Sequence, residues 1–312
     1  MREADIIDLL RPLAANETAA GLADDTALWS PPIGRNLVLT HDIIAEGVHY
    51  LPDDSPSDIA WKLVAVNLSD LAAKGATPRG VLLGLSLSGE DEPWLQGFAD
   101  GLGRVLAEFG VELWGGDTVR APTTSLGCTA IGDVVGRAVA RVGGAAGDRL
   151  YVTGTIGDAG LGLAARRGEI EPNRFLERRY RLPMPRVSFG EKLSSIGATA
   201  AMDVSDGLLI DARRLSRASG CGVEIFLKSL PLSDAARPLV SGTDDLLAAA
   251  RAGDDYELLF SLPPGREQEL KEAAEAARLQ VSCVGHLLAD PDFRVFDEDG
   301  TVIEADVLGY EH

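Results

Sequence analysis

The residues in this sequence that could do chemistry are aspartates, several of them beside a glycine or another small residue at the expected end of a helix or strand. They lie in separate segments of the chain: Asp24 and Asp25 in GLADDTAL, Asp42 in LTHDIIAEGVH, Asp70 in NLSDLAAKGA, Asp117 in WGGDT, and Asp203 and Asp206 in MDVSDGL. Mg²⁺ takes oxygen ligands in octahedral geometry and is usually held by a few carboxylates together with substrate phosphates. Phosphoryl transfer needs charge neutralisation and in-line positioning more than covalent chemistry. The aspartates therefore predict a magnesium-dependent enzyme that moves phosphate from ATP.

Each aspartate also has an ordinary structural interpretation. Asp before Gly is common in turns and Asp after Ser can cap a helix, and for Asp24 and Asp206 taken singly the structural role is favoured. Asp42 and Asp117 differ because each directly follows an apolar segment predicted to be a strand. Ligands in α/β sheets bind at the carboxyl ends of strands. For the whole set, metal binding is the favoured hypothesis.

The glycines suggest how a phosphate could be bound without a P-loop. Gly115 and Gly116 have no Cβ, so the backbone amides before Asp117 could approach a phosphate, although a tight turn would use the same residues. The sequence contains no G-x-x-x-x-G-K-[ST] segment and no G-x-G-x-x-G after the first predicted strand, so neither a P-loop nor a dinucleotide fold is indicated. The segment 154–158 opens a predicted helix, and we interpret it as a strand-to-helix turn.

The elements that must position these residues alternate between helix and strand. Apolar patterns predict strands at 36–40, 80–88, 111–114, 125–135, 149–155, 200–204, 222–227, 256–261 and 281–288, and helices at 57–73, 92–109, 158–167, 208–219 and 265–278. The basic segment 174–186 is predicted to be irregular. The Gly- and Ala-rich segment 141–148 predicts a boundary between two domains, residues 1–140 and residues 141–312, of α/β or α+β class.

Composition excludes some classes of partner and favours one compartment. The 312 residues carry 29 Lys and Arg against 48 Asp and Glu, a net charge of -19 that repels nucleic acid. No apolar segment approaches the length of a bilayer span, so no membrane partner is predicted. Three widely spaced cysteines indicate reduced core residues and not disulfides. These features together predict a cytoplasmic protein.

Taken in order, the motifs resemble those of the thiamine-monophosphate kinase family. The matching segments span nearly the whole chain and follow the family's order: GLADDTAL, THDIIAEGVHYLPD, WKLVAVNLSDLAAKGATP, GGDTVRAP, GDRLYVTGTIGDAGLGL, LPMPRVSFGEKL, AMDVSDGLLIDARRLSRASGCGVEI, AGDDYELLFSLP and GYEH. One such match arises easily by chance, whereas nine in order do not. The resemblance is therefore highly specific.

The resemblance implies a reaction and a fold. The reaction is the transfer of phosphate from ATP to thiamine monophosphate, with several Mg²⁺ ions, and it gives ADP and thiamine diphosphate. We expect direct in-line attack, because the terminal phosphate of thiamine monophosphate is already anionic near neutral pH. The implied fold is that of aminoimidazole ribonucleotide synthetase, with a mixed N-terminal sheet that has helices on one face and a C-terminal α+β domain. In that fold two N-terminal sheets commonly pair, so a homodimer is expected, and the N-terminal domain would bind metal and ATP.

The resemblance also implies a role for particular residues. Metal-binding positions are matched by Asp25, Thr40, His41, Asp42, Asp70, Asp117, Asp203 and Asp206. Positions that contact ATP are matched by Gly116, Asp117, Arg141 and Ser205. Positions near the thiamine phosphate are matched by His49, Asp254 and Tyr310. Asp42, Asp70 and Asp117 are the residues expected to be catalytic.

The sequence departs from the family pattern in three places. Ala23 replaces the glycine of Gly-Asp-Asp, and Lys74 stands where methionine is usual. Asp254 replaces the first glutamate of Gly-Glu-Asp-Tyr-Glu. The last change keeps the charge but shortens the side chain. Two alternatives stay open from sequence: another ATP-dependent enzyme of the superfamily, such as aminoimidazole ribonucleotide or selenophosphate synthetase, and a non-catalytic ligand-binding relative.

Overall fold

The computed structural model describes residues 3–303 and 307–310, so the last two residues of the GYEH motif lie outside it. The chain forms two compact units. The first comprises Met1–Leu71 and Ala76–Gly136, and the second comprises Ala72–Gly75 and Arg137–His312. Among the described residues, no helix combines the length and the apolar character that a membrane crossing requires.

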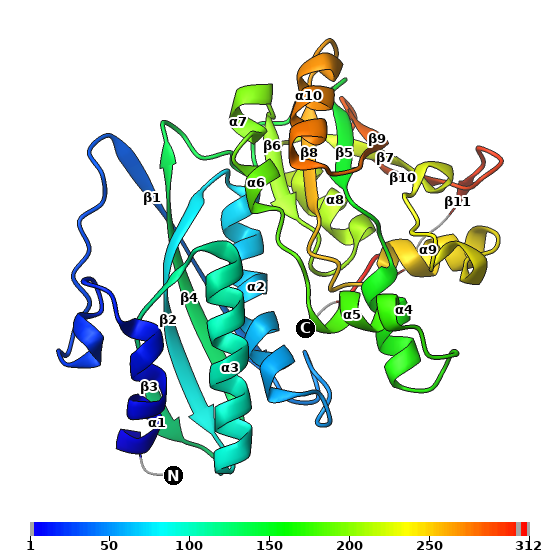
Figure 1. Cartoon of the computed structure of the whole chain (residues 1–312). Helices are drawn as coiled ribbons and strands as arrows, with labels where there is room; N and C mark the ends of the chain where they lie inside the picture. Colours follow the sequence, from blue (N-terminus) through cyan, green and yellow to red (C-terminus); the bar gives the residue numbers. More distant parts are fainter. Residues whose placement is uncertain (1–2, 304–306, 311–312) are drawn as a thin grey trace. The chain divides into compact units, whose positions relative to one another are not determined.

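The first unit contains a mixed four-stranded sheet with the strand order β1-β4-β2-β3. Its strands are β1 (Arg35–Ala45), β2 (Thr77–Leu87), β3 (Glu112–Arg120) and β4 (Ser125–Val135). β2 and β3 pair in parallel, whereas β4 pairs antiparallel with both β1 and β2. The helices α2 (Pro56–Ala73) and α3 (Glu92–Phe109) cover one face of this sheet (Figure 1). The expected mixed sheet with helices on one face is thus confirmed.

Capping residues explain where α3 begins and ends, and a glycine explains how closely it packs. Asp91 caps the helix by accepting a hydrogen bond from the Trp94 amide at 2.9 Å, and Gly110 ends it with a φ of 62°. A Cβ on Gly101 would lie 2.2 Å from the Ser57 carbonyl oxygen, so only glycine allows α3 to approach α2 this closely. The N-terminal segment adds α1 (Glu3–Leu10) and the short 3₁₀ turns η1 (Arg11–Ala14) and η2 (Ala20–Leu22).

Two strands of the first unit are longer than the sequence predicted. Asp42 and Asp117 were expected just after strands, yet both lie within one, because β1 continues to Ala45 and β3 continues to Arg120. The ladder explains the difference: Asp42 is paired with Cys128 on β4, and Gly116 is paired with Leu83 on β2. Backbone hydrogen bonds need no apolar side chain, so the polar and glycine-rich residues remain in the sheet.

The second unit is built on a seven-stranded sheet with the order β11-β10-β7-β9-β5-β8-β6. Its strands are β5 (Arg149–Thr153), β6 (Ala200–Asp203), β7 (Gly222–Phe226), β8 (Leu258–Leu262), β9 (Val281–Leu288), β10 (Phe293–Phe296) and β11 (Val302–Ile303). Its helices are α4 (Asp158–Arg166), α5 (Arg174–Arg181), α6 (Val187–Gly190), α7 (Leu193–Ile196), α8 (Leu208–Ala218), α9 (Thr243–Arg251) and α10 (Glu267–Ala277), with 3₁₀ turns η3 (Leu227–Ser229) and η4 (Arg237–Leu239). β10 and β7 are parallel, and the other recorded pairs are antiparallel.

Alternating side chains give this sheet two apolar faces. Leu150 and Val152 on β5 point into the core formed with α8 and α9, whereas Tyr151 between them points into the core formed with α6, α7 and α10. The expected C-terminal α+β domain is confirmed. One local expectation is corrected: the basic segment 174–186 is not irregular throughout, because Asn173 caps α5 by accepting the amides of Phe175 and Leu176.

Candidate active site

Three of the expected metal-binding residues meet in the first unit, where the inner face of β1 contacts α2. Thr40 donates a hydrogen bond from Oγ1 to Asp70 Oδ2 at 2.5 Å. Asn67 Oδ1 accepts the backbone N–H of Asp42 at 2.9 Å, and Asn67 itself donates to the Leu63 carbonyl. Asp42 and Asp70 are both half-buried, so the cluster offers hard oxygen ligands at a partly open surface. This donor set suits Mg²⁺.

The imidazole of His41 does not join this cluster. Successive strand residues point to opposite faces, so His41 lies on the other side of β1 from Thr40 and Asp42. There its Nδ1 is 2.8 Å from Thr129 Oγ1 on β4. The structure therefore brings the side chains of Thr40 and Asp70 together and leaves that of His41 exposed on the outer face.

His49 lies on a tight turn just after β1, and two hydrogen bonds fix it. The Ala45 amide donates to His49 Nδ1 at 3.1 Å, so the neutral ring carries its hydrogen on Nε2. Lys62 on α2, only 2% exposed, donates from Nζ to the His49 carbonyl at 2.8 Å. Gly47 allows the turn with a φ of 77°. These contacts fix the orientation of the imidazole just after β1.

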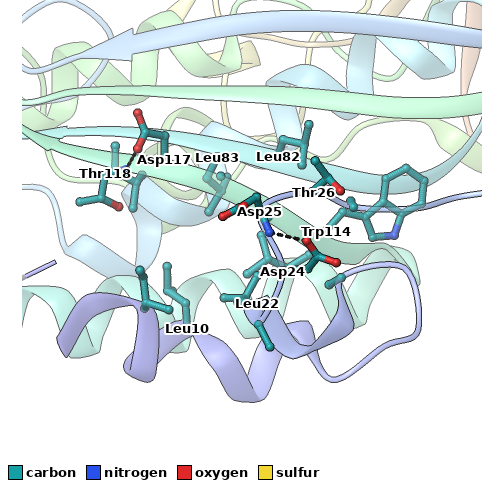
Figure 2. A pocket seen from close by; sticks show the side chains of 18 residues that line it. Leu10, Leu22, Asp24, Asp25, Thr26, Leu82, Leu83, Trp114, Asp117 and Thr118 are labelled. Atoms are coloured by element: carbon teal, nitrogen blue, oxygen red, sulfur yellow. Dashed lines mark hydrogen bonds between the residues drawn. The ribbon is translucent and has the colours of Figure 1, made fainter. Parts of the chain in front are cut away.

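A second group of expected residues lines a cavity of about 760 Å³ beside β3. Figure 2 shows Asp24 and Asp25 on one side of this cavity and Asp117 on β3. Leu10, Leu22, Leu82, Leu83 and Trp114 supply much of its apolar wall. Gly116 also lines it, and a Cβ there would lie 2.2 Å from the Leu83 carbonyl oxygen, so glycine is required for the β2–β3 pairing itself.

The strand register separates Asp117 from Asp42 within this unit. Asp117 is level with Gly84, Gly84 is level with Gly127, and Gly127 is level with Ile43. Asp117 therefore shares the outer face with Ile43, three strand spacings or roughly 14 Å from β1, while Asp42 points to the inner face. Asp42 and Asp70 form one group, and Asp25 and Asp117 form another.

The expected residues of the second unit gather on three segments that are joined by their main chains. The Asp254 amide donates to the Ser205 carbonyl at 2.8 Å, and the Tyr310 amide donates to the Asp206 carbonyl at 2.9 Å. Asp203 ends β6 immediately before this turn. Three segments that are far apart in sequence thus lie side by side, and they carry Ser205 with Asp206, Asp254 and Tyr310.

The carboxylate of Asp206 already has a partner. Arg214 on α8 forms ion pairs with Asp206 and with Asp211, and Asp211 also accepts the backbone amides of Ser205 and Asp206 at 3.1 Å each. A cation at Asp206 would therefore compete with the Arg214 guanidinium. Across the described part of the chain, no three His, Cys, Asp or Glu side chains form a ready-made metal site.

The main chain of Arg141 lies away from the group that contains Ser205 and Asp206. Its carbonyl accepts a hydrogen bond from Ser219 Oγ at 3.4 Å, just beyond the C-terminal end of α8. Ser205 and Asp206 precede the other end of α8, and eleven residues of helix span about 16 Å. The Arg141 side chain is exposed.

Sequence reasoning missed a buried ionic cluster next to this group. Its members are Asp158, Arg179, Arg186, Asp255 and Glu257, and the three carboxylates are at most 1% exposed. Arg179 donates to Glu257 Oε1 at 2.9 Å, and Arg186 donates from Nε to Glu257 Oε2 at 2.7 Å. The available signal was the basic segment 174–186 together with the acidic pattern at 254–257.

Asp255 occupies the N-terminus of α4. It accepts the Gly157 amide at 2.6 Å and the Ala159 amide at 3.2 Å, so these donors are not left for a phosphate. This contact agrees with the interpretation of segment 154–158 as a strand-to-helix turn. Burial raises the pKa of Asp255 to about 7, although Arg179 and the two amides act in the opposite direction.

Comparisons with known proteins identify the family. Residues 23–134 match the model of the AIR synthase related protein N-terminal domain, and residues 145–298 match that of the corresponding C-terminal domain. A thiamine-monophosphate kinase of Salmonella typhimurium is 39% identical over 302 residues, which cover 95% of this chain and 92% of that protein. The chain belongs to the thiamine-monophosphate kinase family.

Further relatives agree with this assignment. A thiamine-monophosphate kinase of Caulobacter vibrioides is 40% identical, with 91% of this chain and 83% of that protein covered. The crystal structure of thiamine-monophosphate kinase from Stenotrophomonas maltophilia K279a superposes with a TM-score of 0.85 at 37% identity, covering 96% of each chain. The structure of AaThiL complexed with AMPPCP and TMP gives a TM-score of 0.79 at 29% identity and covers 100% of this chain and 99% of that one.

Asp255→Asn should change how stability depends on pH. Because the pKa of Asp255 is near 3.8 when unfolded and about 7 when folded, the folded protein holds a proton that the unfolded chain releases between these values. As pH rises from 4 to 7, the free energy of unfolding of the natural chain should therefore fall by a few kcal/mol more than that of Asp255→Asn. The expected difference is about 1.4 kcal/mol per pKa unit. Urea unfolding at several pH values measures this difference. Glu298→Gln, a change at an exposed residue, is the control. If the free energy of unfolding varies with pH in the same way for the natural chain and for Asp255→Asn, the prediction is wrong.

Proposed function

We propose that this chain transfers the γ-phosphoryl group of ATP to thiamine monophosphate and releases ADP and thiamine diphosphate. The observation that carries the proposal is the 39% identity to a thiamine-monophosphate kinase over 95% of the chain. A solved relative, AaThiL, has been seen with AMPPCP and TMP together, and the chain matches that structure over its full length. The grouping of Ser205, Asp206, Asp254 and Tyr310 adds support.

The chemistry requires positioning more than acid–base catalysis. The attacking group is a phosphate oxygen of thiamine monophosphate, which is anionic near neutral pH, so no strong general base is needed. Two polyanions must approach each other in line, and bound Mg²⁺ would supply the charge neutralisation for this. Thr40, Asp42 and Asp70 would hold Mg²⁺, because they offer adjacent oxygen ligands at a half-buried surface.

The remaining residues are assigned to binding. His49 is assigned to thiamine monophosphate, and the Ala45 amide fixes the orientation of its ring. Asp254 and Tyr310 are likewise assigned to thiamine monophosphate. Gly116, Ser205 and Arg141 bind ATP, and Asp25, His41, Asp117, Asp203 and Asp206 provide further metal positions. Residues 1–140 would thus carry most metal ligands, with residues 141–312 as the second domain.

We also propose that the chain forms a homodimer and works in the cytoplasm. Leu37, Leu39 and Ile43 alternate along β1 on the face that lacks helices, and they are 46%, 60% and 53% exposed. An apolar row of this kind suits a second copy of the sheet. A sedimentation mass of one chain, 32.9 kDa, would contradict the dimer. The three free cysteines fit a reducing compartment.

The reaction itself is the direct test. Incubation with Mg-ATP and thiamine monophosphate should give thiamine diphosphate and ADP in equal amounts, resolved by chromatography. Aminoimidazole and selenium substrates of the related synthetases serve as negative controls, because they require different binding groups. A folded protein that forms no thiamine diphosphate under these conditions would overturn the proposed function.

Asp42→Asn should weaken catalysis most at low magnesium. The amide keeps the shape of the side chain but removes the charge that would bind the cation, so kcat/KM should fall by at least about 100-fold at limiting Mg²⁺. Part of the loss should be recovered at high Mg²⁺. Asp100→Asn, an exposed change on α3, is the matched control, and thermal unfolding checks that both variants fold. Near-normal turnover of Asp42→Asn at limiting Mg²⁺ would remove Asp42 from the metal site.

A further inference from the structure

The segment 253–257 has an unusual backbone for its sequence. Asp254 has a φ of 70° and Tyr256 a φ of 49°, both in the left-handed region that non-glycine residues rarely adopt. The residues between and after them, Asp255 and Glu257, are 1% and 0% exposed. Strain of this kind persists only where surrounding contacts hold the backbone, and it is concentrated at functional sites. The question is which contacts hold it here.

The buried side chains of this segment are anchored on one side by the ionic cluster. Glu257 accepts hydrogen bonds from Thr153 Oγ1 at 2.7 Å and from Arg179 Nη2 at 2.9 Å, in addition to those from Arg186. A Cβ on Gly154 would lie 2.1 Å from Glu257 Oε1, so the glycine that directly follows β5 leaves room for this carboxylate. The side chain of Glu257 is therefore fixed from several directions.

Arg179 is the group in this cluster that contacts both the carboxylate and the main chain. Besides Glu257, its Nη2 donates to the carbonyl oxygens of Asp255 and Thr155 at 3.4 Å each. Its Nε lies 3.6 Å from Asp158 Oδ2, and its side chain is 11% exposed. The two N–H groups of Nη2 share these three acceptors, while Nε in the same rigid plane lies beside Asp158. Arg179 thus links α5 and the start of α4 to the strained segment.

The other side of the same segment contacts the turn that follows β6. The Asp254 amide donates to Ser205, the Tyr256 amide donates to Val204 at 2.9 Å, and Tyr256 donates from its hydroxyl to Asp254 Oδ1 at 3.3 Å. The left-handed residues therefore face the group that contains Ser205 and Asp206. Their neighbours in sequence face Arg179.

We propose that Arg179 is a positioning residue for thiamine monophosphate: it holds segment 253–257 in the left-handed conformation that presents Asp254. Arg179 does not itself touch the substrate. The inference rests on the proposed function, in which Asp254 contacts thiamine monophosphate.

Arg179→Lys tests the proposal. Lysine keeps the charge but has one ammonium group, which cannot lie both beside Glu257 and beside Asp158 as Nη2 and Nε of the guanidinium do. The KM for thiamine monophosphate and its Kd measured by calorimetry without ATP should rise about 10-fold or more, because small displacements of a binding group have large effects. The KM for ATP should stay within about 2-fold. Arg178→Lys, on the exposed face of the same helix, is the control and should leave all three values unchanged.

A double variant separates positioning from general stability. Asparagine tolerates the left-handed conformation, so Asp254→Asn should weaken thiamine monophosphate binding without moving the backbone. Adding Arg179→Lys to Asp254→Asn should then cause little further loss. If the two substitutions weaken thiamine monophosphate binding independently, so that their fold-changes multiply in the double variant, the proposal is wrong. Equal increases in KM for both substrates would also overturn it. If Arg179→Lys does not fold, Glu257→Gln, which removes the charge that pairs with Arg179, replaces it under the same criteria.

The outcome is distinct from failure of the proposed function. If the natural chain forms no thiamine diphosphate, the proposed function is wrong and the inference falls with it. If the natural chain is active and Arg179→Lys keeps normal binding of thiamine monophosphate, only the inference is wrong.

Discussion

Burial of the Glu257 carboxylate is the constraint on which much of the second unit depends. A charged group at 0% exposure is tolerated only when it is paired and hydrogen-bonded. Arg179 and Arg186 provide the positive charge, Thr153 a hydroxyl, and Gly154 the space. These partners come from β5 and from the region of α5 and α6, so one carboxylate fixes how several elements meet. The segment that presents Asp254 follows from that arrangement.

The first unit depends on a simpler constraint, the alternation of side chains along a strand. Thr40 and Asp42 on β1 face α2, where Asp70 and Asn67 meet them. His41 and Ile43 face the other side of the sheet. A single strand therefore contributes the proposed metal ligands to one face and an apolar surface to the other. The side chains of neighbouring residues on β1 therefore lie on opposite faces of the sheet.

Much of the fold and part of the site could be predicted from the sequence, for physical reasons that differ. Apolar periodicity was sufficient for α2, α3 and most strands. It failed at Asp42 and Gly116, because a backbone ladder continues through polar residues and glycine. The order of the motifs indicated the family and the candidate site residues. The buried pairs of Arg179, Arg186 and Glu257 could not be derived, because they join residues more than 70 positions apart and neither partner shows its burial in sequence.

The contacts that gather Ser205, Asp206, Asp254 and Tyr310 are bonds between amides and carbonyls. Such bonds are indifferent to the side chains that the residues carry. Evolution can therefore exchange the functional groups at these positions while the frame stays in place, provided that proline is avoided at the donors Asp254 and Tyr310 and that position 254 keeps a residue that tolerates its φ of 70°. Gly253 and Gly309 are excluded from this freedom, since a Cβ would lie 2.6 Å and 2.4 Å from the carbonyl oxygens that they approach. At Tyr310, a different side chain would change what this group of residues offers to a ligand while the main-chain donor stays in place.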